Sequence, residues 1–130
     1  MSIETSKWVR IMCDYAADGV WDDDGVACCP EDLPLPADLA ARIHDWQAWY
    51  DRDCTDYLPV NGLDVISFSM VGLAIAQAVK IALPEWTVVY YDEAKAKAFG
   101  DVNRRMHASP EDRLYFEYEI PLDGPQMASA

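Results

Sequence analysis

The feature that most constrains the fold is an apolar stretch that runs from Asn61 to Tyr91. It begins with Asn61-Gly62, continues as an apolar segment over 63–83, meets Pro84, and ends in a second apolar run over 86–91. Asn61 can accept hydrogen bonds from the first free N–H groups of a helix, and Pro84 ends one. The sequence therefore predicts a helix over 63–83 followed directly by a strand over 86–91.

The pattern inside this stretch predicts that both elements are buried. Apolar side chains surround most of the helix, and such a helix has to be covered on nearly every side. The strand is apolar on both faces: Trp86, Val88 and Tyr90 lie on one, Val89 and Tyr91 on the other. This pattern is typical of a central strand covered on both sides. We expect this helix–strand unit to lie at the centre of the fold.

The helix over 63–83 is long enough to be tested as a membrane span. It contains Gln77 and Lys80, is interrupted by two serines, and has no basic cluster on one flank, so a buried core helix is the better prediction. Residues 1–7 also lack the apolar segment that follows the basic start of a signal peptide. We therefore expect a cytoplasmic protein that does not contact the membrane.

Further elements are predicted on both sides of this unit. Alternating apolar residues favour a strand over 8–15 and an edge strand over 113–120. Asp-Gly between two short apolar runs favours a small β-hairpin over 20–29, with an irregular extended segment as the alternative. Apolar residues at helical spacing predict an amphipathic helix over 37–53, with Gln47 among the polar residues of its other face.

The connecting segments complete the expected fold. Three prolines make 30–36 a rigid connector without regular structure. Residues 94–99 are expected to form a short helix that Gly100 ends, and the polar segment 101–112 is expected to be a mobile loop. The chain is expected to form one α/β (α+β) domain over residues 1–130, with 122–130 as a flexible tail. A small three- to five-stranded sheet would pack against two main helices.

The charge of the chain restricts its partners. The formal net charge is −13, of which residues 1–60 contribute −9 and residues 61–130 contribute −4. Such a field repels nucleic acid and anionic lipid and attracts basic proteins. The only basic doublet, Arg104-Arg105, is too small to form a nucleic-acid surface. Solubility is the alternative explanation of the acidity.

Nothing in the sequence indicates a metal site. If Val20 is taken as the first position of a calcium loop, then Asp22, Asp24 and Glu31 fall on liganding positions, but Val20 stands where a carboxylate is required and Pro30 occupies position eleven. An acidic turn is the simpler prediction. The four cysteines are expected to be reduced thiols. Their spacing is not that of a zinc-binding motif, although a zinc site assembled from distant cysteines and His44 stays open.

Nothing indicates an enzyme either. The chain contains no glycine-rich phosphate loop, and neither His44 nor His107 lies in a local pattern that implies a catalytic base. We therefore predict no catalytic residue, no metal and no cofactor.

Aromatic residues surrounded by acids are the more suggestive feature. Tight interfaces that are steered by charge use buried aromatic anchors with a charged rim. Trp46 and Tyr50 belong to the predicted core stripe of their helix, which leaves Trp21 and Trp49 as candidate anchors. The predicted partner-binding residues are Trp21, Asp22, Asp23, Asp24, Asp45, Trp49, Asp53 and Asp56.

Four motifs carry a resemblance to known proteins. In chain order they are V-R-I-M-C-D-Y, G-V-W-D-D-D-G, W-x-x-W-Y and L-P-E-W-T-V-V-Y-Y-D-E. Over about residues 8 to 93 the chain resembles a group of small acidic bacterial proteins, some of which are similar to the immunity proteins encoded beside polymorphic or secreted toxins. Immunity families share no catalytic residues, so the resemblance implies a binding protein and assigns no site residue.

Three functions remain open from the sequence. The leading hypothesis is a cytoplasmic, non-enzymatic protein that covers the active site of a basic toxin domain, with carboxylates in place of the phosphates that a nuclease grips. The second is a small enzyme or ligand-binding domain with a pocket at the strand ends, using Asp14, Asp92 or Glu93. The third is a structural homodimer that hides exposed aromatic side chains at a two-fold interface.

Overall fold

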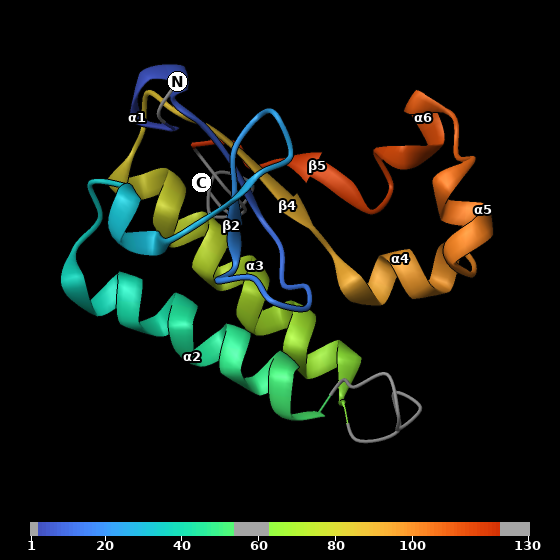
Figure 1. The fold of residues 1–130 in the computed structure, drawn as a ribbon. Helices are drawn as coiled ribbons and strands as arrows, with labels where there is room; N and C mark the ends of the chain where they lie inside the picture. Colours follow the sequence, from blue (N-terminus) through green and yellow to red (C-terminus); the bar gives the residue numbers. More distant parts are fainter. Residues whose placement is uncertain (1–2, 54–62, 123–130) are drawn as a thin grey trace, which may run out of the picture.

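The fold is built on a five-stranded mixed sheet with the strand order β3-β2-β1-β4-β5 (Figure 1). A computed structural model describes residues 3–53 and 63–122 of the chain. The strands are β1 (Trp8–Ile11), β2 (Val20–Trp21), β3 (Ala27–Cys28), β4 (Thr87–Tyr91) and β5 (Glu117–Glu119). The helices are α1 (Ile3–Ser6), α2 (Ala37–Asp53), α3 (Val65–Ala82), α4 (Glu93–Phe99), α5 (Val102–Met106) and α6 (Pro110–Arg113), with a 3-10 turn, η1 (Pro30–Asp32). The predicted α+β single-domain fold is confirmed.

The centre of the sheet is the parallel pair β1 and β4, in which Val9 lies opposite Val88. The other neighbouring pairs are antiparallel. The chain passes from β1 to β4 through the β2–β3 hairpin, α2 and α3, and both long helices lie on one face of the sheet (Figure 1). This arrangement places the core between that face and the two helices.

Trp46 of α2 packs against both α3 and β4. Its ring stacks on Phe68 of α3 with centroids 5.0 Å apart, and its Nε1 donates to the carbonyl oxygen of Phe68 at 3.2 Å. Tyr90 of β4 donates from its hydroxyl to the carbonyl oxygen of Ser69 at 2.8 Å. A Cβ atom at Gly72 would collide with the Tyr90 hydroxyl and the Trp46 ring, so this position of α3 requires glycine.

The predictions for α3 need two corrections. The helix is capped by Asp64, whose Oδ1 accepts from the backbone N–H of Ser67 at 3.2 Å; Asn61 and the predicted connector 55–60 lie outside the described residues. The expectation of cover on nearly every side is wrong, because Ile66, Met70 and Ile81 are 62–68% exposed. The sheet, α2 and α4 pack on only half of the helix.

Among the described residues, α3 alone is long and apolar enough to cross a membrane by length and composition, and 33% of it is buried in the fold. The core helix of a soluble protein meets the same two criteria.

The prediction that β4 is covered on both faces is also wrong. Val88 and Tyr90 are completely buried against the helices, whereas Val89 and Tyr91 on the opposite face are half-buried. The physical reason is that α2 and α3 both pack on one face of the sheet.

Other elements agree with the sequence or differ in length. The predicted hairpin, the helix over 37–53 and the short helix before residue 100 are confirmed. The strand predicted over 8–15 ends at Ile11, and the one over 113–120 is reduced to Glu117–Glu119, although it is an edge strand as expected. The rigid connector contains one 3-10 turn at Pro30–Asp32. The expected tail over 122–130 lies, from residue 123, outside the described part.

The segment over 101–112 is not a loop. It forms α5 and α6, two short helices with side-chain caps. Asp101 accepts from the backbone N–H of Arg104 at 2.9 Å, and Ser109 accepts from that of Asp112 at 3.0 Å. Pro110 follows Ser109 at the first position of α6, where its missing N–H is harmless. Local capping therefore ordered a segment that lacks an apolar stripe.

Candidate protein-binding surface

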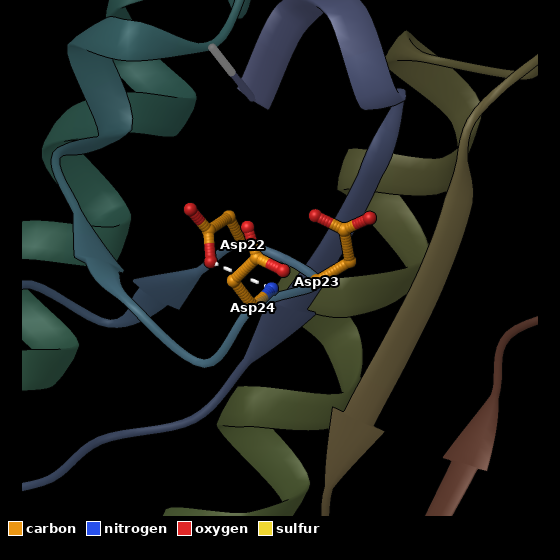
Figure 2. A group of neighbouring side chains, drawn as sticks. All are labelled: Asp22, Asp23 and Asp24. Atoms are coloured by element: carbon orange, nitrogen blue, oxygen red, sulfur yellow. Dashed lines mark hydrogen bonds between the residues drawn. The ribbon is translucent and has the colours of Figure 1, made fainter. Parts of the chain in front are cut away.

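Three of the six acids predicted to bind a partner, Asp22, Asp23 and Asp24, form the turn of the β2–β3 hairpin (Figure 2). The backbone N–H of Gly25, which has a φ of +79°, donates to the carbonyl oxygen of Asp22 at 3.1 Å. Asp22 Oδ1 accepts from the backbone N–H groups of Asp24 and Val26, both at 2.9 Å. Asp22 therefore fixes the turn, while the side chains of Asp23 and Asp24 are exposed to solvent.

The carboxylate oxygens of Asp22, Asp23 and Asp24 lie within 4.8 Å of one another, which is close enough to hold a cation. The turn has its own internal bonds through Asp22, however, and two of the three carboxylates are exposed. Glu31, the distant ligand that a calcium loop would need, pairs instead with His44 of α2. The geometry is that of a solvated acidic turn.

A groove of about 530 Å³ separates this turn from α1 and η1. Its lining residues are Ile3, Glu4, Asp22, Cys28, Glu31, Asp32, Leu33 and Pro34. We call this groove, together with Asp23 and Asp24 at the adjoining turn, the acidic groove. Carboxylates from three separate segments meet here with an apolar floor.

Besides Asp22, two of these carboxylates are held in place by hydrogen bonds. Asp32 Oδ2 accepts from the backbone N–H of Cys29 at 3.0 Å. Glu31 accepts from Nε2 of His44 at 2.9 Å, and this hydrogen bond lowers the pKa of Glu31. The sequence analysis did not assign Glu4, Glu31 or Asp32 to the site. The sequence signal for Glu31 and Asp32 was their position directly after the hairpin, which brings them back towards the acidic turn.

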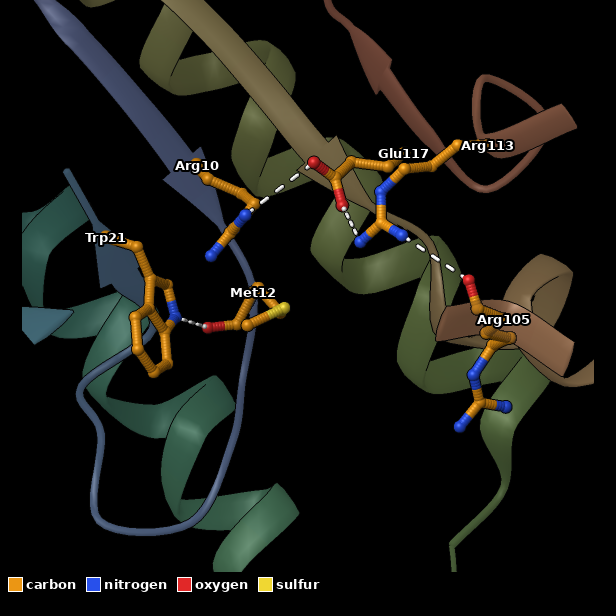
Figure 3. A network of polar contacts seen from close by, with 6 residues as sticks. All are labelled: Arg10, Met12, Trp21, Arg105, Arg113 and Glu117. Carbon is orange, nitrogen blue, oxygen red and sulfur yellow. Dashed lines mark hydrogen bonds and ion pairs between the residues drawn. The ribbon is translucent and has the colours of Figure 1, made fainter. Parts of the chain in front are cut away.

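Trp21, a predicted anchor, lies on the sheet face opposite α2 and α3 (Figure 3). The indole is half-buried, its Nε1 donates to the carbonyl oxygen of Met12 at 2.9 Å, and the guanidinium of Arg10 lies 5.7 Å from the ring centroid. Arg10 also pairs with Glu117 of β5 at 3.6 Å. Trp21 is thus one end of a polar network that crosses the sheet.

The other predicted anchor, Trp49, is half-buried on α2. Its ring packs edge-on against Phe68 at 5.3 Å, and its Nε1 donates to Asp53 Oδ2 at 3.0 Å. Asp45 and Trp49 line a groove of about 320 Å³ between α2 and α3, together with Arg42, Trp46, Val71 and Ile75. Asp56 lies outside the described residues.

The structure therefore brings the predicted residues to two places. The acidic turn lies at the end of the sheet beside α1, whereas Asp45, Trp49 and Asp53 follow one another along α2, on the far side of the core (Figure 1). The acidic groove is the more concentrated of the two, because it gathers carboxylates from α1, the hairpin and η1.

A separate pocket of about 550 Å³ opens where β1 and β4 end. Its lining residues are Met12, Cys13, Asp14, Tyr15, Tyr50, Tyr91, Glu93, Lys97, Val102 and Arg105. Asp14 and Glu93 are thus brought together as the ligand-binding alternative expects. Asp92 is instead buried, where Oδ1 caps α4 and Oδ2 accepts from the Tyr118 hydroxyl at 2.9 Å.

The electrostatics of this strand-end pocket are unusual. Burial raises the pKa of Glu93 to about 7, against the opposing effect of Arg105 and Lys97. Burial, reinforced by Glu93, Asp51 and Asp14, also raises the pKa of the Cys13 thiol. The thiol therefore stays protonated at neutral pH and is a poor nucleophile, because the thiolate is the reactive form.

The fold thus defines a small single-domain α+β protein in which four carboxylates, those of Glu4, Asp22, Glu31 and Asp32, line one groove. Residues 7–93 match the family model described as Serratia CdiI immunity protein-like. The match covers more than half of the chain, so the chain belongs to the Serratia CdiI immunity protein-like family. It begins before β1 and ends as α4 starts, and it includes the hairpin, η1, α2 and α3. The chain matches no curated protein.

Proposed function

We propose that this protein is a cytoplasmic immunity protein that binds a basic toxin domain over its active site and performs no chemistry of its own. The observation that supports this most is the acidic groove, in a chain that belongs to an immunity-protein family and has a net charge of −13. A toxin that cleaves nucleic acid presents cationic groups to phosphates. Rigid carboxylates would pair with those cationic groups in place of phosphates, and they offer no bond that the toxin could cleave.

The fixed geometry of the groove favours tight binding. Asp22, Glu31 and Asp32 are already held by hydrogen bonds, so little side-chain freedom is lost when a partner binds. Glu4, Asp23 and Asp24 remain exposed around them. Exposed acids of this kind accelerate encounter with a basic partner, and the effect weakens as salt is added.

The test uses the protein encoded by the neighbouring gene, which we expect to contain a toxin domain. The toxin is expressed alone and with the immunity protein, and binding of the purified pair is measured by biolayer interferometry at several salt concentrations. A variant that combines Glu4→Gln, Asp23→Asn and Asp24→Asn should slow association by about tenfold and reduce its salt dependence. These three side chains make no described contact that the fold needs.

A charge-matched control separates local from global charge. Asp38→Asn, Glu85→Gln and Glu111→Gln remove the same three charges from exposed positions outside the groove. The control should bind with nearly unchanged kinetics. If the neighbouring protein is harmless when expressed alone, or if it does not bind, the proposed function is wrong. If both variants slow association equally, the toxin is attracted by net charge and the groove is not its site.

The strand-end pocket supports a second candidate function, the binding of a small ligand. The specific observation is a half-buried carboxylate, Glu93, with a pKa of about 7 beside Arg105 and Lys97. Groups that titrate near neutral pH are common in binding and catalytic sites. A thermal-shift screen of small metabolites with the wild type and Glu93→Gln tests this candidate. A ligand that stabilises only the wild type would support it.

A further inference from the structure

The exposed side of α3 carries apolar residues from its first turn to its last, interrupted by the exposed Ser67. Ile66, Met70 and Ile81 are 63%, 68% and 62% exposed, and Ala74 lies between them on the same side of the helix. Fifteen residues separate the first and last of these positions, which corresponds to about 22 Å of helix. We call these four residues the α3 ridge. Exposed apolar residues that line up on one side of an element can mark an interaction site.

The ridge carries no charge, although the chain is strongly acidic. Between Val65 and Ala82 the sequence contains one charged residue, Lys80. That side chain is buried, and its Nζ donates to the carbonyl oxygen of Trp86 at 2.6 Å. A basic partner would find no carboxylate on the ridge. The surface is therefore unsuited to the partner that the acidic groove would attract.

A groove runs along each side of the ridge. On one side is the groove between α2 and α3 that contains Val71, which is 43% exposed, and Trp49. On the other is a groove of about 590 Å³ against α4 and β5. Its lining residues are Leu73, Gln77, Lys95, Leu114, Tyr115, Tyr118, Ile120 and Pro121. Leu114 and Tyr115 are more than half exposed, so the apolar surface continues past the helix.

A ridge beside a groove is a self-complementary shape. If two copies were related by a two-fold axis near the middle of α3, the ridge of each copy would lie beside the ridge of the other. The same contacts would then form twice, as in an isologous interface. The absence of charge matters here, because two chains of net charge −13 repel each other everywhere that their acids come close. The uncharged ridge lets the copies meet along α3, and the one acid that lines a flanking groove, Asp45, lies in that groove together with Arg42.

We infer that the α3 ridge and its flanking grooves form the interface of a homodimer. The acidic groove lies on other elements, namely α1, the β2–β3 hairpin and η1, so each copy keeps its groove accessible. A lipid surface is the competing occupant. It fits less well, because Arg42 and Asp45 on one side and Lys95 on the other border the face, and charged side chains are costly to bury in a bilayer.

The test measures mass and does not require a toxin. Light scattering after gel filtration, over a hundredfold range of concentration, should give a mass that rises from 14.6 kDa towards twice that value. Met70→Lys places a charge in the middle of the ridge and should weaken the dimer at least tenfold. Since Met70 is mostly exposed in one copy, the variant should keep the circular dichroism spectrum and melting temperature of the folded chain.

Met106→Lys is the matched control, because Met106 is 72% exposed on α5, away from the ridge. It should leave the dimer unchanged. A wild type that is monomeric throughout, or a dimer that Met70→Lys does not weaken, would overturn the inference. Flotation with phosphatidylcholine vesicles tests whether the ridge binds lipid instead. If the wild type binds the vesicles and Met70→Lys abolishes that binding, the face would be assigned to lipid and the inference would be overturned as well.

Discussion

The hydroxyl of Tyr118 donates a 2.9 Å hydrogen bond to Oδ2 of the buried Asp92 and thereby joins the edge strand β5 to the start of α4. The same carboxylate caps α4, since its Oδ1 accepts from the backbone N–H of Lys95 at 3.2 Å. One side chain therefore positions both elements. The family match ends at residue 93, so this carboxylate fastens the segment beyond the match to the part within it.

Replacing Asp92 should be more harmful than replacing its partner. Asp92→Ala removes a helix cap and leaves the Tyr118 hydroxyl without its acceptor, which should lower the free energy of unfolding by about 2–3 kcal/mol. Tyr118→Phe leaves Oδ2 of Asp92 without this donor but keeps the helix cap, so it should cost less, about 1–2 kcal/mol. Urea denaturation of both single variants and the double variant measures the coupling. Equal losses for the two single variants would contradict a dual role for Asp92.

Replacing Gly72 by alanine tests whether the free energy of unfolding rises or falls. Helix propensity alone says that Gly→Ala in a helix interior should stabilise by about 1 kcal/mol. In this fold the new Cβ meets the Tyr90 hydroxyl and the Trp46 ring, so Gly72→Ala should instead destabilise by about 1–3 kcal/mol. Thermal unfolding decides between the two. Ala74→Gly, on the exposed side of the same helix, is the control and should cost about 1 kcal/mol, as propensity predicts.

Glu93 should make stability depend on pH. Its pKa is raised from an ordinary 4.5 to about 7 in the fold, so between these values the folded chain holds a proton that the unfolded chain has lost. Stability should therefore fall as pH rises from 4.5 to 7, with the full penalty present above pH 7. Glu93→Gln should remove this decline and raise the free energy of unfolding at pH 8 by up to about 3 kcal/mol.

Chemical denaturation of both proteins at pH 5 and pH 8 measures this effect. The difference between variant and wild type should be larger at the higher pH. If the free energies of unfolding of both proteins changed with pH in parallel, the Glu93 carboxylate would ionise normally. The main argument for ligand binding in the strand-end pocket would then be removed.

The pair formed by Arg10 and Glu117 leads to an asymmetric prediction. Both side chains are less than one-fifth exposed, and Arg10 Nε is buried without a hydrogen-bond partner among the described residues (Figure 3). Glu117→Ala strands that cation and should cost about 3 kcal/mol. Arg10→Met removes the cation, leaves Glu117 paired with Arg113 at 3.1 Å, and should cost less than about 1 kcal/mol. Comparable losses in urea titrations would contradict this asymmetry.

The elements of the fold could be predicted where local chemistry is sufficient. The apolar stripe over 37–53 gave the bounds of α2, and Asp-Gly between short apolar runs placed the hairpin, because side-chain periodicity and turn preference act within a few residues. The caps of α5 and α6 were also in the sequence, at Asp101 and Ser109-Pro110. The absence of an apolar stripe there made a loop look more plausible.

The burial of individual side chains was harder to predict than the secondary structure. Gln47 was placed among the polar residues of its helix, yet it is 3% exposed and donates to the carbonyl oxygen of Asp14 and to Asp51. The apolar circumference of α3 suggested cover on every side, but Met70 is 68% exposed. Composition shows that a side chain prefers burial, and only packing decides whether a layer is there to bury it.

The sequence by itself determined the two long helices, the apolar β4, the acidity and the family resemblance, since each depends on residues that are close in the chain. Only the tertiary structure decided that Glu4, Asp22 and Glu31 share one groove, that Asp14 and Glu93 share another, and that the described sheet and helices cover only half of α3. The physical reason is that these features depend on how sheet and helices stack, and stacking is fixed by contacts between residues that are distant in sequence.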